Sequence, residues 1–75
     1  MTKANLITLS SICLDAIQYY RLQSNIIKKE INLSVNEKDI ELRKELLALY
    51  AQKINNAIDI AAQLKRISDL EELEE

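Results

Sequence analysis

Apolar residues recur along the first half of the chain at the spacing of an α-helix. They are three, four or seven positions apart and therefore share one side of a helix, with Ala16 beside them and Ser24 filling a gap. This first stripe consists of Leu6, Leu9, Cys13, Ile17, Tyr20, Ile27 and Ile31. It predicts a helix over about residues 4–33.

An equivalent stripe in the second half predicts a second helix over about residues 36–70. It consists of Leu47, Tyr50, Ile54, Ala57, Ile58, Ala61 and Leu64. The chain contains no Gly and no Pro, and its abundant Leu, Ile, Ala, Lys, Glu and Gln favour helix at almost every position. Strands would need turn residues that are missing here.

The apolar rhythm lapses for long only around the segment INLSVNEKDIEL, residues 31–42. Ser34 followed by Glu37 is a capping box, in which each side chain satisfies a backbone N–H at a helix start; Asn36 is the alternative cap. A single continuous helix of roughly 70 residues is the competing interpretation, but it needs an unbroken heptad pattern. We therefore expect a turn at residues 34–36.

If the chain folds back at this turn, residues whose numbers sum to about 71 face each other. Ile17 then meets Ile54, Cys13 meets Ile58, and Tyr20 meets Ala51. Apolar positions pair along most of this ladder, as an antiparallel helical hairpin requires. The expected fold is all-α, one helical-hairpin domain over residues 1–75, with Ile17, Ile54 and Ile58 in its core.

The apolar arcs are wider than a two-helix hairpin needs. On a helical wheel the second helix is apolar over about 220°, whereas a helix with one neighbour shows an arc nearer 100°. The extra positions, which we predict to contact a partner, are Leu42, Leu46, Leu49, Ile60, Leu64 and Ile67, with Ile7 and Leu14 on the first helix. Exposed apolar patches of this kind mark association sites. We expect the hairpin to complete a helical bundle or coiled coil with another helical chain, either a second copy or a different protein.

Negative charge is concentrated at the C-terminal end of the sequence. Ten basic residues stand against twelve acidic ones, and residues 69–75 hold five of the acids and no base. Acidic side chains at the C-terminal end of a helix are repelled by the negative end of the helix dipole. We expect residues 69–75 to fray, either as a solubilising end or as an acidic docking tail.

The residue types needed for most catalytic and metal sites are missing. The chain has no His, no Gly and one Cys, which argues against metal sites, catalytic triads and phosphate-binding loops. We therefore predict a non-enzymatic protein with no cofactor, no small-molecule substrate, and no catalytic or metal-binding residues. Cys13 lies within the first stripe, where a buried thiol behaves as a small apolar group.

Localisation follows from two features. A lone cysteine cannot form an internal disulfide and favours a reducing compartment. The longest uncharged run, residues 4–14, is well short of the roughly 20 apolar residues that span a membrane. A cytoplasmic protein without a membrane span is expected.

Nucleic-acid binding is not favoured by the aromatic and basic residues. Tyr19, Tyr20 and Tyr50 could stack on bases, but Tyr20 and Tyr50 lie on the two stripes and are better explained as core or interface residues. The Lys and Arg residues are dispersed and form no basic stripe.

The segment LLALYAQKINNAIDIAAQLKRIS, Leu46 to Ser68, follows a long amphipathic helix and a polar turn. This layout resembles the small helical-hairpin chaperones of bacterial type III secretion systems, the E-type partners that help to hold the needle subunit. The resemblance implies a cytoplasmic heterodimer with a larger helical-repeat co-chaperone, which together keep a needle protein from polymerising. It carries no catalytic residues. The alternative function is a homodimeric four-helix-bundle regulator of phage or plasmid type, similar in outline to small RNA-binding hairpin dimers.

Overall fold

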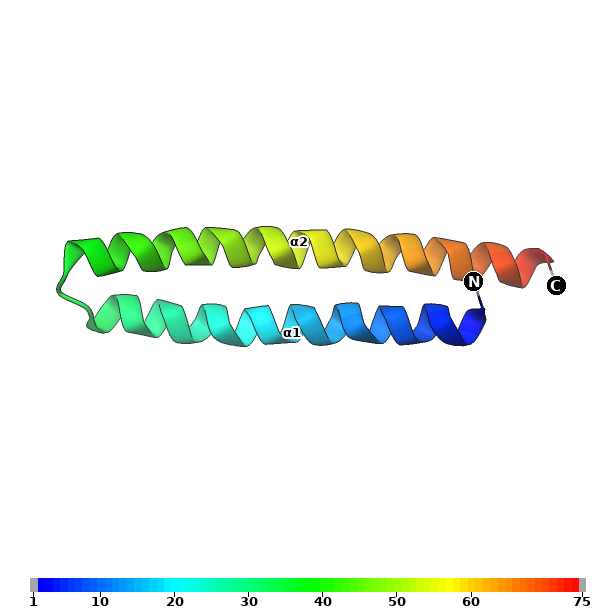
Figure 1. The fold of residues 1–75 in the computed structure, drawn as a ribbon, viewed down its shortest axis with the longest axis horizontal. Helices are drawn as coiled ribbons and strands as arrows, with labels where there is room; N and C mark the ends of the chain where they lie inside the picture. Colours follow the sequence, from blue (N-terminus) through cyan, green and yellow to red (C-terminus); the bar gives the residue numbers. More distant parts are fainter. Residues whose placement is uncertain (1, 75) are drawn as a thin grey trace.

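The chain forms an antiparallel pair of long helices (Figure 1). The computed structural model describes the backbone of residues 2–74 and the side chains of residues 2–70. Helix α1 spans Lys3–Leu33 and helix α2 spans Glu37–Glu74, with residues 34–36 between them. The two-helix, all-α prediction is confirmed, and residues 2–74 contain no strand. A single continuous helix is wrong, because the chain reverses direction between α1 and α2.

Side chains and backbone groups at the turn end one helix and start the next. The backbone N–H of Ser34 donates to the carbonyl of Ile31 at 3.3 Å and closes α1. At the start of α2 the side-chain oxygen of Asn36 accepts the N–H groups of Lys38, at 2.9 Å, and Asp39, at 3.4 Å. Asn36 is therefore the cap, and the predicted capping box of Ser34 and Glu37 is wrong. Since α2 begins at Glu37, the residue in the capping position is Asn36.

Helix α2 continues through Glu74. It therefore extends past the expected end at about residue 70, and Glu75 lies outside the described residues. Fraying of residues 69–75 stays a prediction. The acids of this segment do not end the helix at residue 70. An unfavourable charge near a helix end costs only about 0.3–1 kcal/mol and is screened by salt.

The two helices meet along a regular seam, in which successive positions alternate steps of three and four. This is the heptad pattern of a coiled coil. On α1 the hairpin seam consists of Leu6, Ser10, Cys13, Ile17, Tyr20, Ser24, Ile27 and Ile31, and on α2 of Ile40, Arg43, Leu47, Tyr50, Ile54, Ala57, Ala61, Leu64 and Ser68. All of these side chains are buried or half-buried. The centres of the Tyr20 and Tyr50 rings lie 5.2 Å apart. This agrees with the expected pairing of residues whose numbers sum to about 71.

Two residues of the predicted stripes lie outside the hairpin seam. Leu9 is 37% exposed and Ile58 is 43% exposed, so Ile58 is not the core residue we expected. Each is adjacent in sequence to a smaller seam residue, Ser10 or Ala57, and one position is a rotation of about 100° on a helix. Of the other expected core residues, Ile17 is buried and Ile54 is half-buried.

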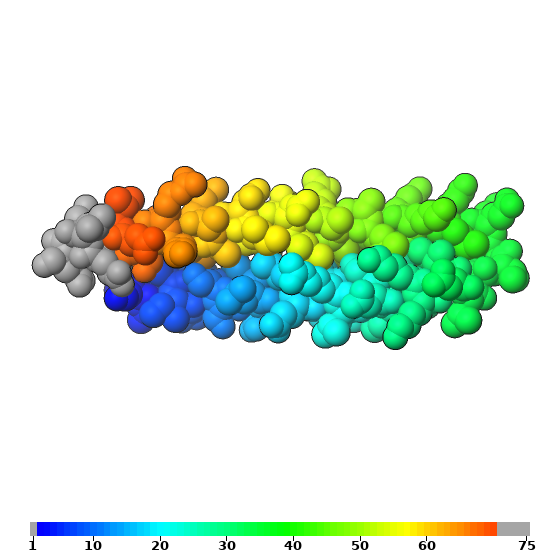
Figure 2. Space-filling model, turned by 180° about the vertical axis from the view of Figure 1, so that it is seen from behind, coloured from blue at the N-terminus to red at the C-terminus, as the bar shows by residue number. Residues whose placement is uncertain are grey.

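The core between the helices is thin. The helices touch along their length (Figure 2), and the molecule measures 59 × 14 × 13 Å. Among residues 2–70, the buried apolar side chains are Leu6, Ile17, Ile27 and Leu64. Each contributes about 1.5–3 kcal/mol when fully buried. A core of this size gives little stability to a small domain by itself.

Candidate protein-interaction face

Each helix carries a second line of large apolar side chains, located one position before the hairpin seam and continued at the same spacing by Leu33 and Leu70, beyond the last seam residue of each helix. We call these two lines together the apolar face. Its residues are Leu9, Ile12, Tyr19, Ile26 and Leu33 on α1, and Leu42, Leu46, Leu49, Ile60, Ile67 and Leu70 on α2. Their exposed fractions run from 36% for Leu46 to 84% for Leu33.

The two lines lie on the same side of the hairpin. In an antiparallel pair, positions that precede the seam rotate toward one common side, because the two helices run in opposite directions. A hollow of about 350 Å³ shows this directly, since Glu30 of α1 lines it together with Leu42 and Leu46 of α2. The apolar face is therefore one surface shared by both helices.

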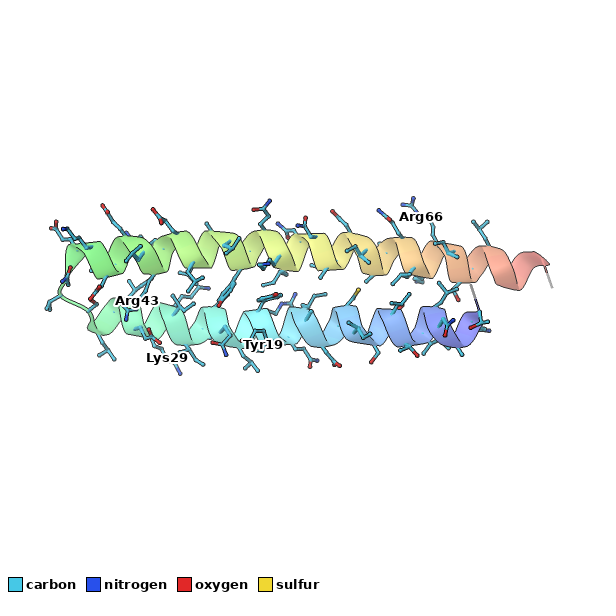
Figure 3. The ribbon with its side chains drawn as sticks, in the orientation of Figure 1. Tyr19, Lys29, Arg43 and Arg66 are labelled. Atoms are coloured by element: carbon cyan, nitrogen blue, oxygen red, sulfur yellow. The ribbon has the colours of Figure 1, made fainter. Side chains whose placement is uncertain are left out.

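Polar and aromatic contacts hold the helices together at this surface. Arg43 Nε lies 2.9 Å from Glu30 Oε2 and joins α2 to α1. Lys53 Nζ lies 5.8 Å from the centre of the Tyr20 ring, and the Tyr19 ring packs edge-on against Tyr20 at 5.5 Å. Figure 3 shows Arg43 between the helices, whereas Lys29 and Arg66 point away from the neighbouring helix. The apolar face is thus crossed by a few fixed contacts, and its aliphatic side chains are interrupted by polar residues such as Gln23, Asn56 and Gln63.

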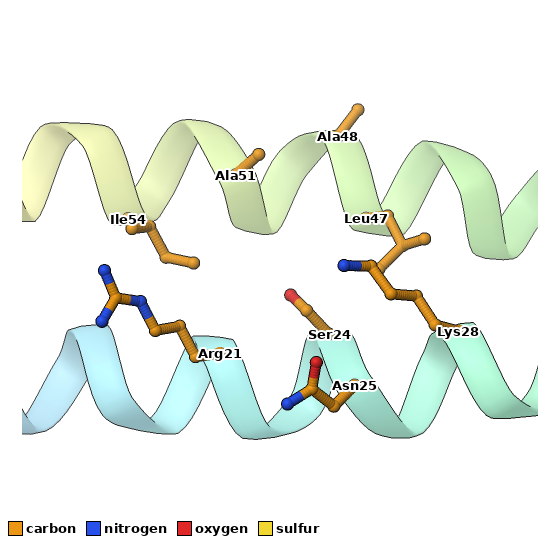
Figure 4. Close-up of a pocket in the computed structure, with 8 residues that line it drawn as sticks. All are labelled: Arg21, Ser24, Asn25, Lys28, Leu47, Ala48, Ala51 and Ile54. Atoms are coloured by element: carbon orange, nitrogen blue, oxygen red, sulfur yellow. The ribbon is translucent and has the colours of Figure 1, made fainter.

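The opposite side of the hairpin is more polar. A groove of about 490 Å³ crosses its middle (Figure 4). From α1, Arg21 and Lys28 extend toward α2, and Ser24 lies between them. Nearer the ends of the chain, Ile7 and Leu14 line a hollow of about 340 Å³ with Lys65. Because Lys65 follows the α2 seam by one position, this hollow is on the side away from the apolar face.

The structure separates the eight predicted interface residues into three groups. Leu42, Leu46, Leu49, Ile60 and Ile67 lie together on the apolar face. Leu64 does not, because it is only 9% exposed and belongs to the hairpin seam. Ile7 and Leu14 are 61% and 57% exposed, but they lie on the opposite side and cannot share one partner surface with the other five.

The sequence interpretation missed the α1 half of the apolar face. A usable signal was present, because Ile12, Tyr19, Ile26 and Leu33 are each seven positions apart. An exact seven-residue apolar repeat is typical of a second coiled-coil seam. Leu9 belongs to this line, but its spacing from Leu6 and Cys13 also fits the intrachain stripe, which hides the repeat.

Other kinds of site find no support in the part of the chain that the structure describes. No cluster of His, Cys, Asp and Glu residues there has the grouping needed to hold a metal ion. Cys13 is a half-buried free thiol within the hairpin seam. Neither helix has, over its described residues, an apolar stretch long enough to cross a membrane.

Comparison with known proteins found no matching family model, no similar curated protein and no similar solved structure. The resemblance to type III secretion chaperones therefore stays a prediction.

Proposed function

We propose that this chain is a non-enzymatic protein-interaction module, a small assembly factor that binds helical chains through its apolar face. The observation that carries the proposal is the placement of eleven large, exposed apolar side chains on one side of a hairpin whose own core is thin. Large contiguous apolar patches on a monomer mark sites of association. Their periodicity continues along both helices, which suits a partner that is itself helical.

The exposed area supports the same proposal. A compact protein of this mass would expose about 4,700 Å². The hairpin exposes 5978 Å², an excess of roughly 1,300 Å². A standard protein interface buries about 800 Å² on each partner. The excess is therefore large enough for one complete interface.

Two forms of this function differ in the identity of the partner. In the chaperone form the partner is a different, larger helical protein, as the resemblance to E-type needle chaperones implies. In the regulator form the partner is a second copy, and the functional unit is a four-helix bundle. In both forms the partner packs helices against the lines of both α1 and α2.

The experiment that tests the proposal places charges on the apolar face. We would prepare Leu49→Glu/Ile60→Glu and measure molar mass by light scattering and helicity by circular dichroism. Burying a carboxylate in an apolar interface is strongly unfavourable. The expected result is loss of association with helicity retained in the dissociated chain, since Leu49 and Ile60 are 46% and 50% exposed and lie outside the hairpin seam.

A matched control is available on the other side of the hairpin. Ile7→Glu/Leu14→Glu adds the same two charges at sites of similar exposure. We expect this variant to associate as the wild-type chain does. If the two double variants have the same effect on association, the apolar face is not the binding surface and the proposal is wrong.

A further inference from the structure

We infer that the occupant of the apolar face is a second copy of this hairpin, stacked face to face with both turns at the same end. The inference rests on the proposed function, because it requires the apolar face to bind helices. It goes further by naming the partner, the stoichiometry and the relative orientation.

The number of helices in the occupant follows from the angle between the two apolar surfaces of each helix. The hairpin seam and the apolar face are one residue apart, which is about 100° around the helix. In a square four-helix bundle each helix has two neighbours at about 90°, whereas three packed helices meet at about 60°. The observed separation is that of a four-helix bundle, so the occupant supplies two helices.

A second copy meets this requirement without further assumptions. It supplies two antiparallel helices of the same length. Its own apolar face is exposed along that length and would be buried by the first copy. Two hairpins together expose twice 5978 Å². A compact protein of twice the mass exposes about 7,800 Å², so each copy would have to bury about 2,000 Å². Such an interface is larger than the standard of about 800 Å² on each partner.

The pairing of charged residues differs between the two possible orientations, most clearly at Lys53 in the middle of the apolar face. With the turns at opposite ends and full overlap, α2 packs antiparallel on α2 of the second copy. Lys53 then lies opposite Lys53 of the second copy. Glu45 also approaches Asp59 of the second copy, and Lys38 approaches Arg66. Like charges oppose each other at each of these levels, which is unfavourable.

With the turns at the same end, α1 packs on α2 of the second copy. Tyr19 then lies level with Lys53 of the second copy, a pairing suited to a cation–π contact. Lys29 comes within about one helical turn of Glu45. Asp39 approaches Glu30, whose carboxylate is already paired with Arg43. At the same offset Asp15 comes near Asp59 of the second copy, an unfavourable pair at an exposed edge where its cost is small. The arrangement avoids the Lys53–Lys53 pair at the middle of the apolar face and replaces it with Tyr19 beside Lys53.

The distance between the two turns distinguishes the orientations. We would attach a spin label at Val35→Cys in a Cys13→Ser background, and measure the label-to-label distance by double electron–electron resonance. Val35 is 97% exposed, so a label there disturbs no packing. Same-end stacking predicts a distance below about 30 Å, given helix-to-helix spacings of 8–10 Å. Opposite-end stacking would separate the labels by a distance close to the 59 Å length of the molecule.

The molar mass of the unlabelled wild-type chain completes the test. We expect twice the chain mass of 8.6 kDa, about 17 kDa. A mass of 17 kDa with a short distance supports the inference, and a long distance overturns it. A monomeric wild-type chain also overturns it, but leaves the proposed function standing if a different helical protein binds and Leu49→Glu/Ile60→Glu abolishes that binding. Association that is unaffected by this double variant overturns both.

Discussion

Single side chains decide where the second helix begins. The Asn36 carboxamide oxygen accepts two backbone N–H groups of the first turn of α2, whereas Ser34 contributes its backbone N–H to the end of α1. The two residues therefore have separate roles. Only the role of Asn36 depends on its side chain.

Replacing Asn36 with Ala should destabilise the protein by about 0.5–2 kcal/mol, because the N–H groups of Lys38 and Asp39 lose their acceptor. In a domain of this size each kcal/mol lowers the melting temperature by about 4–8 °C. Thermal unfolding followed by circular dichroism measures the change. Ser34→Ala keeps the backbone hydrogen bond and should stay within about 0.5 kcal/mol of the wild type. A larger loss for Ser34→Ala than for Asn36→Ala would show that the cap is misassigned.

Burial separates two isoleucines that look equivalent in the sequence. Ile17 is 6% exposed in the hairpin seam, and Ile58 is 43% exposed one position beyond it. Ile17→Ala should cost about 2–5 kcal/mol, because it leaves a cavity between the helices. Ile58→Ala should cost less than about 1 kcal/mol. Equal losses in urea unfolding would contradict the assignment of the seam.

Between the two helices, the hairpin seam is far from uniformly apolar. It includes Arg43, whose side chain is 33% exposed and whose Nε contacts Glu30. An ion pair that is this exposed contributes only about 0.2–1 kcal/mol. A polar residue at a seam position typically selects one register at a cost in stability.

Arg43→Leu should therefore stabilise the hairpin by about 1 kcal/mol, since the gain in apolar burial exceeds the loss of the ion pair. Glu30→Gln is the control, because it removes the ion pair and adds no apolar surface. Glu30→Gln should destabilise by at most about 1 kcal/mol, and by less at high salt. Chemical denaturation measures both variants. A lower denaturation midpoint for Arg43→Leu would show that the ion pair matters more than we infer.

Periodicity predicts the two helices and their antiparallel pairing, because apolar stripes and the turn at residues 34–36 are local properties of the sequence. It assigns Leu9 to the seam in place of Ser10, because an apolar residue is the natural choice for a buried position. The structure places Ser10, Ser24 and Ala61 in the seam, where small side chains let two helices approach closely. Which of two adjacent positions faces inward depends on the paired helix, and the apolar stripe of one helix taken singly does not show it.

The side of the hairpin on which an exposed residue lies also depends on how the two helices pair. Ile7 and Leu14 lie off the main stripe, as do Leu42 and Leu49, and a single-helix wheel does not show that these pairs point to opposite sides. Only the antiparallel pairing brings the α1 line that includes Ile12 and Tyr19 beside the α2 line that includes Leu46. The apolar face is therefore a property of the pair of helices.

The stability of the complete hairpin depends on burial of its apolar face against a partner. Concentration-dependent thermal unfolding of the wild-type chain tests this. Association stabilises by mass action, so a hundredfold increase in protein concentration should add about 2.7 kcal/mol per dimer. A unit of two chains gains about 2–4 °C for each kcal/mol, so the melting temperature should rise by roughly 5–10 °C. Leu49→Glu/Ile60→Glu should melt lower and show no such dependence. A wild-type melting temperature that stays constant across that hundredfold range would show that the hairpin is stable alone, with its apolar face exposed.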